Sequence, residues 1–230
     1  MNFYVGTSGY SYKEWKGTFY PRKLPAKQML SYYSAHFRTV EINYTFKRLP
    51  TASVLQTWAD AVPADFQFAL KAPEQITHRK RLKDVGDAVA NFLKIAGKFK
   101  KRLGPLLFQL PPNFKKDAPR LRAFLALLPR KRRVAFEFRH PSWLDDEVFE
   151  LLRDHRATLC IADDVLEVPV VATTDWGCLR LRRPAYSAAA LKAWMKRIRK
   201  QDWRDVFVFF KHEDEGKGPR FAKRFLKLVT

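Results

Sequence analysis

The chain has 230 residues, and 47% of them are hydrophobic, which is enough to build the core of one domain. Lysine and arginine number 44 against 23 aspartates and glutamates, so the formal net charge is +21 at pH 7. This balance favours anionic partners such as nucleic acid, phosphates or acidic surfaces, with a solvated basic surface as the alternative. No uncharged stretch reaches the about 18 residues of a membrane helix, and the first residues lack a signal-peptide pattern. We therefore expect a soluble, cytoplasmic protein.

Short apolar runs recur along the chain, and each ends in polar residues that precede a loop and a helix-like stretch. The runs begin near residues 3, 39, 66, 106, 134, 159, 179 and 206. Apolar residues at helical spacing fill most of the intervals, over residues 25–37, 51–62, 84–101, 117–128, 145–152 and 187–198 and from 219 onward. This alternation predicts an α/β protein with a parallel sheet.

Several helix starts carry residues that cap or pre-form the first turn. Thr51, Asp145 and Ser187 are placed to open three of the helices, and Pro219 is placed as a first helical residue. One interval is irregular, because residues 164–175 leave no room for a full helix. The sequence thus predicts a single domain over residues 1–230, a TIM (β/α) barrel that is somewhat distorted between strands 6 and 7.

In such a barrel the carboxyl ends of all strands lie on one face, which carries the active site. Three acids at or near strand ends, Glu41, Glu137 and Asp163, are the candidate catalytic residues, since a pair of carboxylates can act as acid and base or as acid and nucleophile. Carboxylates beside many arginines more often serve as ion-pair partners. Other residues at and after the strand ends are the candidate ligand-binding residues: Ser8, Asn43, Lys71, His78, Gln109, Arg139, His140, Trp143, Arg180, Arg182, Lys211 and His212.

Other patterns leave alternatives open. The acids together with His140 and His212 are a candidate metal cluster, but no HExxH, CxxC pair or Gly-x-Ser-x-Gly motif is present, so no metal ligand or cofactor is assigned. Residues 216–219 after strand 8 are either a phosphate site at a helix N-terminus or a capped turn. Aromatic residues in the loops of that face suit bases or sugars, or form a hydrophobic lid.

The most conspicuous basic runs fall elsewhere. Residues 98–102, 130–133 and 196–200 each end a helix or precede a strand, which places them toward the opposite face of the barrel. Cations there complement helix C-termini. They are also able to hold a polyanion on the face away from the site.

Several ordered motifs resemble the YecE-like family, a TIM-barrel domain of unknown function. They are Val5-Gly6-Thr7-Ser8-Gly9-Tyr10 with Trp15, residues 37–43 (FRTVEIN), residues 68–72 (FALKA), residues 107–112 (LFQLPP), residues 136–140 (FEFRH) with Trp143, residues 179–182 (LRLR) and residues 209–212 (FFKH). The resemblance covers nearly the whole chain and implies the barrel fold and the location of its site. Many relatives carry a His-Gly pair where this chain has Arg182-Arg183, so no role for a histidine is transferred. A link to DNA-repair nucleases with barrel folds is a fold-level analogy.

The sequence therefore indicates a TIM-barrel protein with a polar, cation-rich pocket at the carboxyl ends of its strands. We expect the pocket to bind an anionic, phosphate-bearing ligand, with nucleic acid in a processing or repair-like role as the leading candidate. One alternative is a hydrolase or lyase that acts on a small sugar or a phosphorylated metabolite. Another is a non-enzymatic accessory protein that binds nucleic acid. No membrane partner is expected, and the sequence does not decide the cofactor, the oligomeric state or whether the protein is an enzyme.

Overall fold

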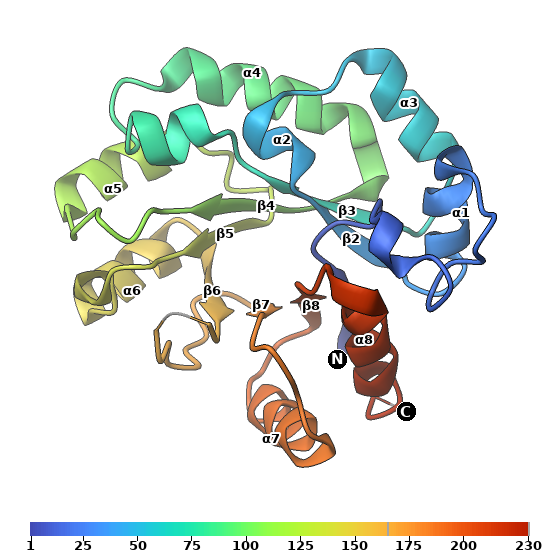
Figure 1. The fold of residues 1–230 in the computed structure, drawn as a ribbon. Coiled ribbons are helices and arrows are strands. Elements are labelled where there is room, and N and C mark those ends of the chain that lie inside the picture. Colours follow the sequence, from blue (N-terminus) through green and yellow to red (C-terminus); the bar gives the residue numbers. More distant parts are fainter. Residues whose placement is uncertain (165, 230) are drawn as a thin grey trace.

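The computed structural model describes residues 1–164 and 166–229 and shows a barrel of eight parallel strands (Figure 1). The strands are β1 (Asn2–Thr7), β2 (Thr39–Ile42), β3 (Gln67–Lys71), β4 (Leu103–Gln109), β5 (Val134–Glu137), β6 (Ala157–Ala162), β7 (Trp176–Leu181) and β8 (Asp205–Phe210). Their hydrogen-bonded order is β1-β8-β7-β6-β5-β4-β3-β2. The predicted α/β barrel is confirmed.

Helices lie around the outside of the strands (Figure 1). The α-helices are α1 (Met29–Ser34), α2 (Tyr44–Lys47), α3 (Ala52–Asp60), α4 (Gly86–Ala96), α5 (Ala118–Leu125), α6 (Asp146–Asp154), α7 (Ala188–Arg199) and α8 (Lys217–Leu226). Short helical turns are η1 (Lys13–Trp15), η2 (Ala26–Gln28), η3 (Gln75–Arg79), η4 (Gly97–Arg102), η5 (Pro141–Trp143) and η6 (Asp214–Gly216). Within the described residues, no helix has the length and apolar character needed to cross a membrane.

The helix starts follow the capping residues of the sequence. The side chains of Thr51, Asp145 and Ser187 each accept a hydrogen bond from a backbone N–H in the first turn of α3, α6 and α7. The prediction for Pro219 was wrong by two residues, because α8 begins at Lys217. Proline is tolerated at the third position since the first four N–H groups of a helix have no intrahelical acceptor.

The barrel closes between β1 and β2 through a side chain. The Tyr33 hydroxyl accepts a hydrogen bond from the Thr7 N–H (2.8 Å) and donates one to the Thr39 carbonyl (3.0 Å). Gly6 lies at the closest approach, where an added Cβ atom would be 2.1 Å from the Thr39 carbonyl oxygen. The Gly9 N–H donates to the Glu41 carbonyl at the upper end of the same seam. The tyrosine hydroxyl therefore replaces some of the backbone hydrogen bonds that would otherwise join β1 to β2.

The distortion that the sequence predicts between strands 6 and 7 is present. Residues 163–175, apart from residue 165, contain no helix. Thr173 instead attaches the segment to β6, because its hydroxyl accepts from the Leu159 N–H (3.0 Å) and donates to the Ala157 carbonyl (2.8 Å).

The barrel interior below its mouth is apolar. A buried cluster of Ala69, Leu107, Ala135, Cys160, Trp176, Cys178, Phe207 and Phe209 fills it. Near the amino ends of the strands, the rings of Tyr4 and Phe207 stack at 4.6 Å. Charged side chains at the mouth therefore sit above a dry core, where unpaired charge is costly.

Candidate functional site at the mouth of the barrel

Arg180 of β7 is the centre of the mouth, and only 1% of its surface is exposed. Its guanidinium makes two hydrogen bonds to Glu41 of β2, from Nε to Oε2 (2.8 Å) and from Nη2 to Oε1 (2.7 Å). The remaining Nη1 donates to Oε2 of Glu137 from β5 (2.5 Å). This Glu41–Arg180–Glu137 triad ties three strands together across the barrel. Bidentate geometry of this kind suits the planar fork of arginine.

Glu137 is fully buried and its other oxygen is also occupied. Oε1 accepts hydrogen bonds from Gln109 Nε2 (2.7 Å) and from Arg139 Nε (2.8 Å). Burial alone would raise the pKa of Glu137, but the charges of Arg180, Arg139 and Arg182 hold it well below its usual range. The carboxylate is consequently ionised at neutral pH and serves as an acceptor for several donors.

A second layer of charge lies at the rim. Asp164 contacts Arg182 Nη1 at 3.2 Å and Arg139 Nη2 at 3.4 Å. The same Nη1 of Arg182 is buried yet has no hydrogen-bond partner among the described residues. Burial and the nearby charge of Arg180 lower the pKa of Arg182. This nitrogen of Arg182 is thus held by charge attraction to Asp164 and, at 3.9 Å, to Glu137, without a hydrogen bond to either.

Lys71, at the end of β3, brings a further cation to the mouth. Its Nζ lies 3.9 Å from the centre of the Phe46 ring. Burial lowers the pKa of Lys71 to about 8, the charge of Arg180 acts in the same direction, and Glu41 and Glu137 oppose them. The loss of hydration therefore destabilises the charged amine of Lys71 more than the nearby carboxylates stabilise it.

Lys211, after β8, completes the ring of cations. Burial and the charge of Arg182 lower its pKa, while Glu213 at the exposed edge lies 3.8 Å away. The mouth therefore holds five cations, Lys71, Arg139, Arg180, Arg182 and Lys211, against the inner carboxylates Glu41, Glu137 and Asp164 and the exposed Glu213 at its edge. The surplus is positive in a partly buried setting.

Asp163 faces a different set of partners from Asp164. Its carboxylate accepts hydrogen bonds from the Arg182 backbone N–H and from the Tyr186 hydroxyl, both at 2.7 Å. It holds the loop after β7 in place rather than meeting the triad. Sequence analysis singled out Asp163 and missed Asp164 as the residue at the rim. Side-chain alternation, which sends adjacent residues to opposite faces, was the available signal.

The three candidate histidines differ in placement. His78 packs against Phe46 (4.9 Å between ring centres) and shares a hydrogen bond with the Thr77 hydroxyl, next to Lys71. Burial, followed by the charge of Lys71, lowers its pKa. His140 instead accepts from the Ser142 N–H at the start of η5, and His212 hydrogen-bonds the Arg183 carbonyl. Only His78 adjoins the cation cluster.

Trp143, Ser8 and Asn43 also lie apart from the cation cluster at the mouth. Trp143 is fully buried, stacks on Phe138 and donates its indole N–H to the Phe114 carbonyl (2.6 Å), so a ligand has no access to it. The Ser8 hydroxyl is buried and has no partner among the described residues. Asn43 lines a separate 330 Å³ hollow with Tyr10, Tyr12, Tyr44 and Trp58.

The glycines of the segment after β8 pack closely against neighbouring loops. Gly216, Gly218 and Pro219 are buried. A Cβ atom at Gly216 would lie 2.5 Å from the Thr18 hydroxyl, and one at Gly218 would lie 3.0 Å from the His212 carbonyl oxygen. Gly216 and Pro219 also line a 450 Å³ hollow together with Arg220, Lys223 and Arg224. The phosphate site and the capped turn therefore both stay predictions for residues 216–219.

No metal centre is apparent at the mouth. Within residues 1–164 and 166–229, no three His, Cys, Asp or Glu side chains form a group that could hold a metal ion. The carboxylates of the triad point at arginine nitrogens, and this arrangement organises hydrogen-bond donors around the mouth.

The family model described as "Protein of unknown function DUF72" matches residues 4–230. The chain belongs to the DUF72 family. Among curated DUF72-like relatives, UPF0759 protein YecE of Escherichia coli K12 is 35% identical over 115 residues, which cover 50% of this chain and 42% of YecE. The chain thus matches less than half the length of YecE. UPF0759 protein YunF of Bacillus subtilis 168 is 25% identical over 92% of this chain and 79% of its own length. These relatives agree with the YecE-like resemblance of the motifs.

Solved DUF72 structures share the fold. A DUF72 protein from Thermotoga maritima superposes with a TM-score of 0.85 and 29% identity, over 100% of this chain and 99% of that one. One from Enterococcus faecalis gives 0.84 at 17% identity, over 99% of this chain and 95% of that one, and supports the fold alone. The barrel and the family are therefore established together.

Proposed function

We propose that the mouth of the barrel binds a phosphate-bearing anion, and that the anion belongs to a nucleic acid. The observation that carries the proposal is the surplus of cations there. Lys71, Arg182 and Lys211 are partly buried, and their pKa values are lowered by burial and by neighbouring positive charge. A bound anion would relieve this repulsion, which gives the ligand a source of affinity.

The donors at the rim suit a phosphate group. Arg139 and Arg182 share Asp164 at 3.4 and 3.2 Å, and the Arg182 nitrogen in this ion pair, Nη1, is buried and makes no hydrogen bond with the described residues. A phosphate offers several acceptor oxygens and can engage both guanidinium groups together with Lys71. The triad below holds Arg180 and Glu137 rigid, so the rim arginines are supported from beneath.

A second hollow beside the mouth favours a polymer over a small ligand. Lys47, Arg48, Arg79 and Lys80 line this 580 Å³ space together with Phe46 and Glu74. Glu74 pairs with Lys47 and Arg79, so Arg48 and Lys80 are the cations of the hollow without an ion pair among the described residues. The Nζ atoms of Lys71 and Lys47 lie 3.9 Å and 5.3 Å from the centre of the Phe46 ring. Phe46 therefore links the cations of the mouth to those of the hollow. A chain of phosphates can follow such a track, whereas a single phosphorylated metabolite would use only the mouth.

The proposal concerns binding. A processing or repair-like reaction would take place on the phosphate held by Arg139 and Arg182. The catalytic roles of Glu41, Glu137 and Asp163 stay predictions. Their ion pairs and hydrogen bonds support a positioning role for all three carboxylates.

The test uses the titration of Lys71. Fluorescein-labelled oligo(dA) is a suitable probe because adenine does not titrate in the alkaline range. Since the pKa of Lys71 is about 8, and a bound anion would raise it, affinity should be constant below that pH and fall above it. Lys71→Arg should retain affinity at high pH, and Lys71→Gln should bind more weakly at neutral pH without this dependence. Identical pH profiles in all three proteins would rule the mouth out.

A second comparison separates a polymer from a metabolite. Arg48 and Lys80 line the hollow, are exposed and have no ion pair among the described residues. Arg48→Gln with Lys80→Gln should weaken oligo(dA) binding by up to about fivefold per charge and leave competition by ribose 5-phosphate unchanged. The metabolite alternative is favoured if this double variant changes the binding of neither ligand while Lys71→Gln weakens the binding of both.

A further inference from the structure

A second cationic groove lies at the other end of the barrel. It has a volume of 630 Å³ and is lined by Asn2, Arg130, Lys131, Arg132, Arg133, Arg156, Thr174, Asp175, Trp176, Arg204 and Asp205. These residues start or precede β5, β6, β7, β8 and β1, which are neighbours in the sheet. The groove therefore spans five adjoining strands at their amino ends, opposite the mouth.

The charges in this amino-end groove are unbalanced. Six cations face two carboxylates, and both carboxylates are already paired, Asp205 with Arg133 and Asp175 with Arg204. Lys131, Arg132 and Arg156 are exposed and form no ion pair with the described residues. Three positive charges consequently converge on one concave surface without protein partners.

Helix dipoles do not account for Lys131 and Arg132. The stabilisation of a cation by a helix C-terminus falls off within the last turn. Helix α5 ends at Leu125, and residues 130–133 begin five positions beyond it. They stand in the connection to β5. Arg130 donates to the Asp154 carbonyl at the end of α6, and Arg133 lies over the buried Phe207 ring. Lys131 and Arg132 are exposed and make no such contact with the described residues.

Arg156 adds a backbone argument. It follows α6 with a φ of +55°, in the left-handed region that favours glycine at the end of a helix. A side chain at such a position strains the backbone. Here that side chain lines the groove beside residues 130–133, which come from a different connection of the barrel.

We propose that the amino-end groove binds the phosphodiester backbone of nucleic acid at a site separate from the mouth. Five of its six cations are arginines, whose planar forks match phosphate oxygens. The surface is concave, and its one aromatic residue, Trp176, is 6% exposed, whereas a membrane-binding surface presents accessible aromatic residues to the interface. Contacts of this kind recognise the backbone and are independent of base sequence.

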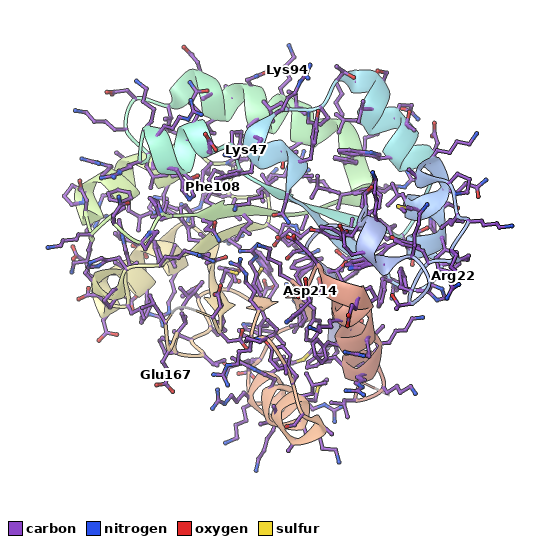
Figure 2. The ribbon with its side chains drawn as sticks, in the orientation of Figure 1. Arg22, Lys47, Lys94, Phe108, Glu167 and Asp214 are labelled. Carbon is purple, nitrogen blue, oxygen red and sulfur yellow. The ribbon has the colours of Figure 1, made fainter. Side chains whose placement is uncertain are left out.

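The experiment neutralises only the cations without partners. Lys131→Gln, Arg132→Gln and Arg156→Gly form the groove variant, and glycine at position 156 also relieves the left-handed backbone. Arg133 is left intact because it pairs with Asp205 and lies 5.3 Å from the Phe207 ring. The control variant is Lys23→Gln, Lys27→Gln and Lys94→Gln, which removes the same charge from exposed sites outside the groove. Lys94 extends outward from α4 (Figure 2).

Binding of a labelled duplex of about 20 base pairs is measured by fluorescence anisotropy at several KCl concentrations. The log–log salt dependence should become shallower by about 0.9 for each lost phosphate contact, or about 2.7 for the groove variant. Its affinity should fall at least about tenfold, with the control variant within about twofold of the parent. The control variant should melt as the parent does, and the groove variant should melt at the same temperature or higher, because glycine at position 156 relieves the backbone strain.

Three results would overturn the proposal: no salt-dependent binding by the parent protein, equal weakening by the two variants, or an unchanged salt slope in the groove variant. Vesicles of phosphatidylcholine and phosphatidylserine give the remaining check. Loss of vesicle binding with unchanged duplex binding would assign the groove to a membrane. The Lys71-dependent pH profile belongs to the mouth and should persist in the groove variant, so the two proposals fail independently.

Discussion

Glu137→Gln tests whether the triad supports the fold. Glutamine has almost the same shape, but one of its two terminal atoms becomes an N–H donor. In the parent, one carboxylate oxygen of Glu137 faces Arg180, and the other faces Gln109 and Arg139. The amide nitrogen must therefore point at a donor in either orientation. The substitution leaves at least one buried donor without an acceptor.

The expected loss of stability depends on the hydrogen bonds that Arg180 retains in the variant. Removing one member of a buried ion pair costs about 3–5 kcal/mol. Arg180 retains both hydrogen bonds to Glu41, at 2.8 and 2.7 Å, so we expect a loss at the lower end, about 3 kcal/mol. For a domain of this size that loss lowers Tm by about 6–12 °C. Urea unfolding at neutral pH measures the free energy directly.

The pH dependence has a definite sign. The pKa of Glu137 is lowered in the folded protein, so its carboxylate stabilises the fold fully above the unfolded value of about 4.3. That stabilisation is lost as the pH falls toward the folded value. The difference between parent and Glu137→Gln should therefore shrink in acid.

A matched control is Glu150→Gln on α6. Glu150 pairs with Arg153 one turn away, and its side chain is 65% exposed, so its loss should cost less than about 1 kcal/mol. If Glu137→Gln unfolds at the same urea concentration as the parent, the triad is not a stabilising element and the reasoning fails. Unchanged stability and oligonucleotide binding, with loss of a measured reaction, would instead assign Glu137 a catalytic role.

Three further substitutions probe the frame that holds the site. Tyr33→Phe should cost about 1–3 kcal/mol in urea unfolding, because the Thr7 N–H and the Thr39 carbonyl lose their bridge; a smaller loss would show that water replaces it. Gly6→Ala should lower Tm by more than Tyr33→Phe, since its Cβ would lie 2.1 Å from the Thr39 carbonyl oxygen, and a neutral effect would contradict the tight seam. Ser187→Ala should cost about 1 kcal/mol through loss of the α7 cap, and an unchanged Tm would argue against that cap.

Local patterns in the sequence determined the architecture. Alternation of apolar runs with helical periodicity predicted the parallel barrel, and Thr51, Asp145 and Ser187 marked helix starts that the structure confirms. These features depend on side chains a few positions apart, so the order of residues is enough to reveal them. The missing helix between β6 and β7 was predictable for the same reason, since the interval is too short to hold one.

Tertiary structure alone decided which side chains meet. Arg180 pairs with Glu41 and Glu137, which lie 139 and 43 positions away along the chain, and barrel closure sets those partners. Trp143 shows the converse, because a loop position beside a strand end became part of the packed core. Residues 130–133 and Arg156 gather in one groove only because β5 and β6 are neighbours in the sheet. Sequence periodicity reports the face on which a residue lies, whereas pairing depends on the register and closure of strands that are distant in the chain.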